Sequence, residues 1–176
     1  MENEIISYIE MCQREGTSLQ KGMNFGLKRN HSVVLMSLRE NAPYRDRLEE
    51  DGTTLIYEGH DAARNKSAPE PKRISQPEST PAGTLTENGK FHKTAQDYKK
   101  GLRLPERVLV YEKLHRGIWS YNGVFHLTDS WIENDGIRNV FKFKLVAVES
   151  DEDFSKPANN ESERRRIIPT AVKLEV

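Results

Sequence analysis

Two tyrosines and one aspartate in residues 31–61 could together bind a flat, hydrogen-bonding ring. Tyr44 and Asp46 lie in a polar loop, and Tyr57 ends a β-prone segment that follows it. Two aromatic faces can sandwich such a ring, and a carboxylate between them can accept a hydrogen bond from an amino group on its edge. The ordinary alternative is packing and turn chemistry, because tyrosines are common in strands and aspartate is common in loops. The spacing alone leaves both interpretations open.

The elements that would position these side chains are two strands. Residues 33–36 form an apolar run typical of a buried strand, and residues 53–57 form a second β-prone run. Gly52 ends the loop between them, and Gly59 follows the second run. Two strands holding one loop could form the walls of a slot.

Two helices are predicted outside this region. Residues 2–15 place Ile5, Ile9 and Cys12 at helical spacing, and Gly16 suits the C-terminal cap. A second helix is expected to follow Thr86, which is a suitable N-cap. The polar segment between Gly16 and His31 is expected to be a loop.

The second half of the chain is rich in strand signals. Residues 107–114, 118–128 and 140–148 are predicted strands, with Asn122-Gly123 as a turn or bulge. Residues 62–83 are rich in proline, serine and charge, which predicts a long loop. Several strands, two helices and no βαβ alternation predict an α+β fold, a strand-dominated β-barrel with a few flanking helices.

Composition limits the class of protein. The formal net charge is zero, but basic residues outnumber acidic ones between Thr17 and Val148 and the flanks are acidic, which is permissive for DNA binding. The single cysteine excludes an internal disulfide and a cysteine-based zinc site within this chain. No signal peptide or membrane-length apolar run is visible. We therefore expect a cytoplasmic, nucleoid-associated protein with no membrane partner.

Five segments, in this order, resemble the SRA (SET- and RING-associated) domain: SVVLMSLRENAPYRDRLEEDGTTLIYEGHD, LTENGKF, ERVLVYEK, GIWSYNGVFHLTDSW and VFKFKLVAVE. The similarity is to the bacterial version at the front of SRA-HNH modification-dependent restriction endonucleases, and it covers residues 16–149. The resemblance implies a PUA-like barrel that flips a 5-methylated cytosine out of duplex DNA and holds it in a pocket.

The resemblance also implies roles for individual residues. The base pocket would comprise Tyr44, Asp46, Tyr57, Glu58, Gly59 and His60. Glu58 stands where the eukaryotic motif has threonine, and His60 where it has a small residue beside the methyl group. The modified base is therefore left open between 5-methylcytosine and 5-hydroxymethylcytosine. Contacts to DNA would come from Lys28, Arg29, Asn30, Arg45, Arg64, Asn65, Lys66 and Lys90.

The expected organisation is an N-terminal helix over residues 1–16, an SRA-like domain over 17–149 and a charged linker over 150–176. The linker would lead toward an HNH nuclease domain that the chain lacks. That domain would carry the divalent metal, the catalysis and a possible homodimer contact. We expect no catalytic residue, metal or cofactor in this chain. The alternatives are a PUA-like RNA or nucleotide-binding module of the YTH or ASCH type, and a hydrolase whose site is not visible.

Overall fold

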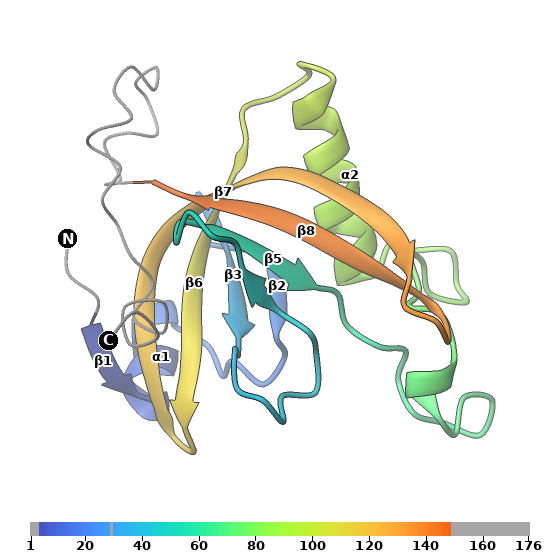
Figure 1. The fold of residues 1–176 in the computed structure, drawn as a ribbon, viewed down its shortest axis with the longest axis horizontal. Helices are drawn as coiled ribbons and strands as arrows, with labels where there is room; N and C mark the ends of the chain where they lie inside the picture. Colours follow the sequence, from blue (N-terminus) through green and yellow to red (C-terminus); the bar gives the residue numbers. More distant parts are fainter. Residues whose placement is uncertain (1–3, 29, 149–176) are drawn as a thin grey trace.

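The computed structural model describes residues 4–28 and 30–148 of the 176-residue chain. One sheet of eight strands has the order β2-β3-β6-β7-β8-β5-β4, and β1 pairs with β7 outside this path. The strands are β1 (Glu4–Ser7), β2 (Met23–Lys28), β3 (His31–Met36), β4 (Arg47–Leu48), β5 (Thr54–Glu58), β6 (Glu106–His115), β7 (Ile118–Asn134) and β8 (Asn139–Ala147). The helices are α1 (Tyr8–Glu15), α2 (Glu87–Lys99) and a short 3₁₀ helix, η1 (Pro71–Arg73) (Figure 1).

The sheet buries apolar side chains on both faces, because successive residues of a strand point to opposite sides. On one face Val34 packs in the larger core cluster, which also contains Phe91 and Ala95 of α2. On the other face Val33 packs in a smaller cluster with Met11 of α1. Each helix therefore covers a different face of the sheet.

The strand-dominated α+β architecture confirms the prediction, but the sheet is not a closed barrel. Its path ends at β2 on one side and β4 on the other, and no ladder pairs these two strands within residues 4–28 and 30–148. β3 runs parallel to β6, whereas the other ladders are antiparallel. The curvature is visible in the long, bent β7 and β8 (Figure 1).

The predicted N-terminal helix is wrong in its first half. Residues Glu4–Ser7 form β1, which pairs with β7 and buries Ile6. The helix begins only after Ser7, whose hydroxyl accepts from the Glu10 amide in a capping box. Its end is as predicted, because Gly16 adopts a left-handed φ of 73° that ends the helix.

The segment before β3 also differs from the prediction. Residues Met23–Lys28 were expected to be loop but form β2, which pairs with β3. Its sequence, MNFGLK, lacks the continuous apolar run that signals a buried strand, and only Met23 of it is fully buried.

Other elements confirm the sequence-based prediction. Thr86 caps α2 by accepting from the Gly89 amide. A register shift opposite Gly123 marks the expected bulge in β7. Residues 62–83 form an irregular loop apart from η1 and one isolated bridge. The predicted linker over 150–176 lies outside the described residues. In the described part of the chain, the helices are too short and too polar to cross a membrane.

Candidate nucleic-acid interface

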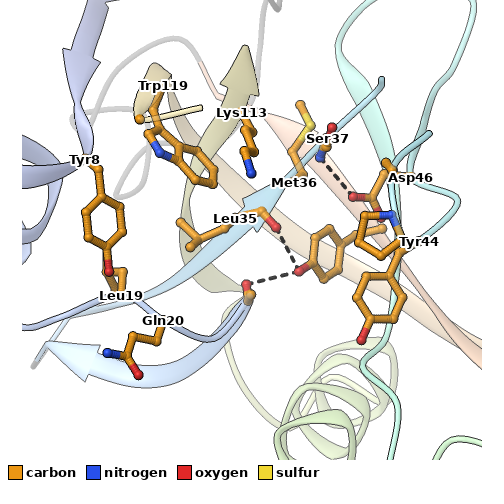
Figure 2. A pocket seen from close by; sticks show the side chains of 15 residues that line it. Tyr8, Leu19, Gln20, Leu35, Met36, Ser37, Tyr44, Asp46, Lys113 and Trp119 are labelled. Atoms are coloured by element: carbon orange, nitrogen blue, oxygen red, sulfur yellow. Dashed lines mark hydrogen bonds between the residues drawn. The ribbon is translucent and has the colours of Figure 1, made fainter. Parts of the chain in front are cut away.

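A cavity of about 490 Å³ lies beside the carboxyl end of β3. Its walls come from the start of α1, the segment before β2, the end of β3, the loop that follows β3, and residues of β5, β6 and β7 with the turn before β7. Tyr44, Asp46 and Tyr57 all line it. Figure 2 shows Tyr44 and Asp46 on one side of the cavity and Tyr8, Gln20 and Trp119 on the other. The structure thus brings together the two phenols and the carboxylate that the sequence singles out, around an open space.

Tyr57 is held rigidly in the cavity wall. Tyr57 is 4% exposed. Its hydroxyl lies 3.0 Å from the carbonyl oxygens of both Gly22 and Leu35, which share its single proton. Burial raises the pKa of the Tyr57 phenol well above its usual value, so the phenol stays neutral. A Cβ at Gly22 would come within 2.8 Å of the Tyr57 hydroxyl, so glycine is required there.

Asp46 is fixed by two backbone amides, one just after β3 and one at the end of β5. Its Oδ1 accepts from the Glu58 amide at 2.9 Å. Its Oδ2 accepts from the Ser37 amide at 3.2 Å (Figure 2). Burial raises the pKa of this carboxyl to about 7, against the opposing effect of those two hydrogen bonds. Each carboxylate oxygen can accept more than one hydrogen bond, so Asp46 retains capacity for a ligand.

Tyr44 is oriented by the long loop. The ammonium of Lys72 lies 4.0 Å from the centroid of the Tyr44 ring, and the Tyr44 hydroxyl accepts from the Asp61 amide at 3.2 Å. Lys72 is itself anchored by the carbonyl of Pro43 at 2.6 Å and the carboxylate of Asp61 at 2.9 Å. Because Lys72 covers one face of the ring, Tyr44 can offer only its other face to a base.

The remaining predicted pocket residues do not line the cavity. Glu58 is buried in an ion-pair network, with its carboxylate 3.1 Å from Lys142 and 3.8 Å from Arg138. Gly59 is packed so closely that a Cβ would lie 2.5 Å from the side-chain oxygen of Asn88. The His60 amide donates to the same oxygen at 2.9 Å. These three positions hold the end of β5 in place.

The predicted contacts at the β2–β3 turn lie far from the cavity. Lys28 and Asn30 flank the start of β3, whereas the cavity adjoins Ser37 just beyond its other end. At about 3.3 Å per residue, the seven steps from Asn30 to Ser37 span roughly 23 Å. Arg29 lies outside the described residues.

The other predicted contacts are exposed or already engaged. The side chains of Arg45, Arg64 and Lys66 lie in exposed segments. The Asn65 side-chain oxygen accepts from the Ser67 and Ala68 amides, so it stabilises a turn. Lys90 of α2 pairs with Glu87 at 2.9 Å. Arg45 is the only one of these adjacent in sequence to a cavity-lining residue.

Several cavity residues escaped the sequence analysis. Lys113 and Trp119 are directly opposite each other in the β6–β7 ladder, so both reach the same wall. Gln20 and Gly22 come from the segment before β2. A β6–β7 hairpin was predictable, but its register and its position beside residues 19–22 were not. In residues 4–28 and 30–148, no cluster of three or more His, Cys, Asp or Glu side chains could hold a metal ion.

No protein-family model matches the chain, and no curated protein matches it. Solved structures do. The SUVH5 SRA domain in complex with hemi-methylated CG DNA is 19% identical with a TM-score of 0.55, covering 82% of this chain and 86% of that one. The chain has the fold of an SRA domain. The SUVH5 SRA domain bound to fully hydroxymethylated CG DNA is 18% identical with a TM-score of 0.53, over 83% and 87% of the two chains.

A restriction enzyme shares this SRA fold. AspBHI, a DNA modification-dependent restriction endonuclease, is 16% identical with a TM-score of 0.53. The match covers 80% of this chain and 67% of that one. The SRA resemblance inferred from the sequence is therefore confirmed at the level of the fold, and the cavity belongs to an SRA framework.

Proposed function

We propose that this SRA domain binds duplex DNA carrying a 5-modified cytosine and holds the modified base, turned out of the helix, between Tyr44 and Tyr57. The observation that carries the proposal is the cavity lined by both phenols and Asp46. The fold shared with SUVH5 SRA domains, which were solved with methylated and hydroxymethylated DNA, supports this ligand class. Both 5-methylcytosine and 5-hydroxymethylcytosine are candidate bases.

Stacking in the slot would offset much of the cost of extruding the base. Extruding a base costs a few kcal/mol in lost stacking and pairing. Stacking on an aromatic side chain returns about 1–3 kcal/mol per base. The methyl group adds only about 0.8 kcal/mol by burial, so selectivity for the modification needs shape as well. Because Tyr44 and Tyr57 are fixed by hydrogen bonds before the base arrives, little ordering of the pocket is needed.

Asp46 would distinguish cytosine from thymine. An ionised carboxylate accepts a hydrogen bond from the cytosine amino group, whereas thymine presents a carbonyl oxygen that the carboxylate repels. The Glu58 and Ser37 amides fix the direction of this carboxylate. Asp46 therefore reads the edge of the base while the phenols hold its faces.

In its wider setting we propose that the domain targets a modification-dependent HNH endonuclease. The catalysis, the divalent metal and a dimer contact would reside in the nuclease domain, and this chain would be a non-catalytic reader. The fold shared with AspBHI supports a role in restriction.

Tyr44→Ala tests the base slot. Methylated-duplex binding should weaken at least tenfold through lost stacking, while weak, salt-sensitive binding to unmodified duplex persists. Titrations of wild type and variant against duplexes that differ in one 5-methyl group measure this. Tyr98→Ala on α2 is the matched control, because Tyr98 does not line the cavity.

Two outcomes would overturn the proposal. Equal loss of methylated and unmodified binding would make Tyr44 a structural residue only. Wild-type preference for single-stranded RNA over methylated duplex would favour the PUA-like RNA-binding alternative. A 2-aminopurine opposite the modified cytosine reports extrusion directly, because its fluorescence should rise when its partner leaves the helix.

A further inference from the structure

The cavity has a second end that the base slot does not use. We call Tyr44, Asp46 and Tyr57 the phenol end, and Tyr8, Gln20, Lys113 and Trp119 the lysine end. In Figure 2 the side chain of Lys113 projects into the cavity between Trp119 and Met36. Because Lys113 and Trp119 are cross-strand partners, the ladder itself holds them side by side.

Within residues 4–28 and 30–148, no hydrogen bond or ion pair engages the side-chain donors of Lys113, Trp119 or Gln20. None of the ion pairs among the described residues includes Lys113, although other lysines pair with acids, such as Lys93 with Asp97 at 2.9 Å. Among the described residues, Asp46 is the only acidic side chain that lines the cavity, and it lies at the phenol end. The ammonium, the indole N–H of Trp119 and the amide of Gln20 together favour a ligand group that is rich in acceptors and negatively charged.

The size and polarity of the cavity fit more than one ring. A volume of about 490 Å³ lies within the 300–1,000 Å³ range typical of sites for drug-sized ligands. One end carries an acceptor, Asp46, and the other a cation, Lys113. A cytosine nucleotide has the complementary arrangement, with an amino group on the base and a negative charge on its phosphate.

We propose that the lysine end binds the phosphodiester of the nucleotide whose base occupies the phenol end. Lys113 supplies the charge, and Trp119 packs against the sugar and donates from its indole N–H. This inference rests on the proposed function and extends it, because the recognised unit becomes a whole nucleotide. The competing occupant is a large hydroxylated substituent on the base, which has acceptors but no charge.

Lys113→Gln, with Lys144→Gln as control, tests the inference. Lys144 is an exposed lysine on β8 that does not line the cavity. We expect Lys113→Gln to bind methylated duplex about tenfold more weakly and to lower the slope of log affinity against log salt by about one. Lys113→Arg should restore most of the affinity, and thermal melts should show that all three variants fold.

Neutralising one phosphate makes the test specific. A methylphosphonate at the linkage on either side of the modified cytosine should weaken wild-type binding by a similar factor at one of the two positions. At that position it should not weaken duplex binding by Lys113→Gln any further. Two changes that remove the same interaction are not additive. Additive losses at both linkages, or Lys113→Gln behaving like Lys144→Gln, would overturn the inference.

Duplexes that carry a large hydroxylated 5-substituent distinguish the phosphodiester from the competing occupant of the lysine end. If Lys113→Gln weakens binding only when the cytosine carries a large hydroxylated 5-substituent, the lysine end faces the base and the inference is overturned. If wild type shows no preference for modified duplex at all, the proposed function fails as well. If wild type prefers modified duplex but Lys113→Gln has no effect, the proposed base slot stands and only the inferred phosphate contact is overturned.

Discussion

The two faces of β5 place buried polar side chains in opposite situations. Tyr57 and Glu58 are neighbours in sequence, and each is 4% exposed. The carboxylate of Glu58 is surrounded by Lys142 at 3.1 Å, the Gln76 side chain at 3.5 Å and the Arg45 amide at 3.4 Å. Tyr57 instead adjoins an open cavity.

The difference separates a structural role from a ligand-binding one. Around Glu58 the chain itself satisfies the buried charges, so no capacity remains for a ligand. Near Tyr57, Asp46 can accept and Lys113 can donate further hydrogen bonds that the described residues do not supply. Asp46 and Lys113 are therefore better candidates for ligand contacts than Glu58, whose buried charge is already paired.

Glu58→Ala should give the largest effect, and it acts on stability. Removing one partner leaves Lys142 as an uncompensated buried charge, which costs about 3–5 kcal/mol in the free energy of unfolding. Denaturant titration measures the loss. Glu49→Ala is the control, because Glu49 pairs with Arg47 at the surface and should matter by less than about 1 kcal/mol. Recovery in Glu58→Leu/Lys142→Leu would confirm the cause, and a small loss in Glu58→Ala would show that the network is dispensable.

Asp46→Asn should change specificity and its pH dependence. The carboxyl of Asp46 has a pKa of about 7, so it is increasingly ionised between about pH 6 and about pH 8. Wild-type preference for cytosine over thymine in the slot should rise about tenfold over that range, because the neutral acid can donate to the thymine carbonyl. The variant should show a weak, pH-independent preference. Competition binding at both pH values measures it, and an unchanged profile would assign edge recognition elsewhere.

The same substitution should alter the pH dependence of folding. The folded-state pKa of Asp46 lies above its usual value of 3.8, so the unfolded chain releases the proton first. Its contribution to stability is full below about pH 4 and is lost as pH rises through about 7. In Asp46→Asn that loss should be absent. Urea titrations across the range, compared with wild type, provide the measurement.

Lys72→Ala should give the smallest effect. Its ammonium lies over the Tyr44 ring, a contact worth about 0.5–1 kcal/mol at an exposed site. Methylated-duplex affinity should fall a few-fold, because Tyr44 loses its fixed orientation. Arg73→Ala is the control, since its only partner among the described residues is the exposed Glu70. Equal losses in both variants would point to general charge rather than to Tyr44.

The sequence predicts what depends on neighbours in the chain. The capped start of α2 at Thr86 and the bulge at Gly123 follow from local residue types, and both are present. The strand form of residues Glu4–Ser7 depends on pairing with β7, so a helical pattern of isoleucines was misleading there. Residue types singled out Tyr44, Asp46 and Tyr57, but their spacing also allowed ordinary packing, and only the family resemblance favoured a pocket. Lys113 was missed because only the β6–β7 register brings it to the cavity.

The open sheet gains a further property from Asp46 and Tyr57. Asp46 accepts from an amide just after β3 and from one in β5, and the Tyr57 hydroxyl on β5 reaches a carbonyl of β3. β3 and β5 lie near opposite margins of the sheet, with β6, β7 and β8 between them. Side-chain hydrogen bonds therefore connect β3 and β5, which no ladder joins within the described residues. If the proposed base binds beside Asp46 and Tyr57, residues that connect both strands would contact it.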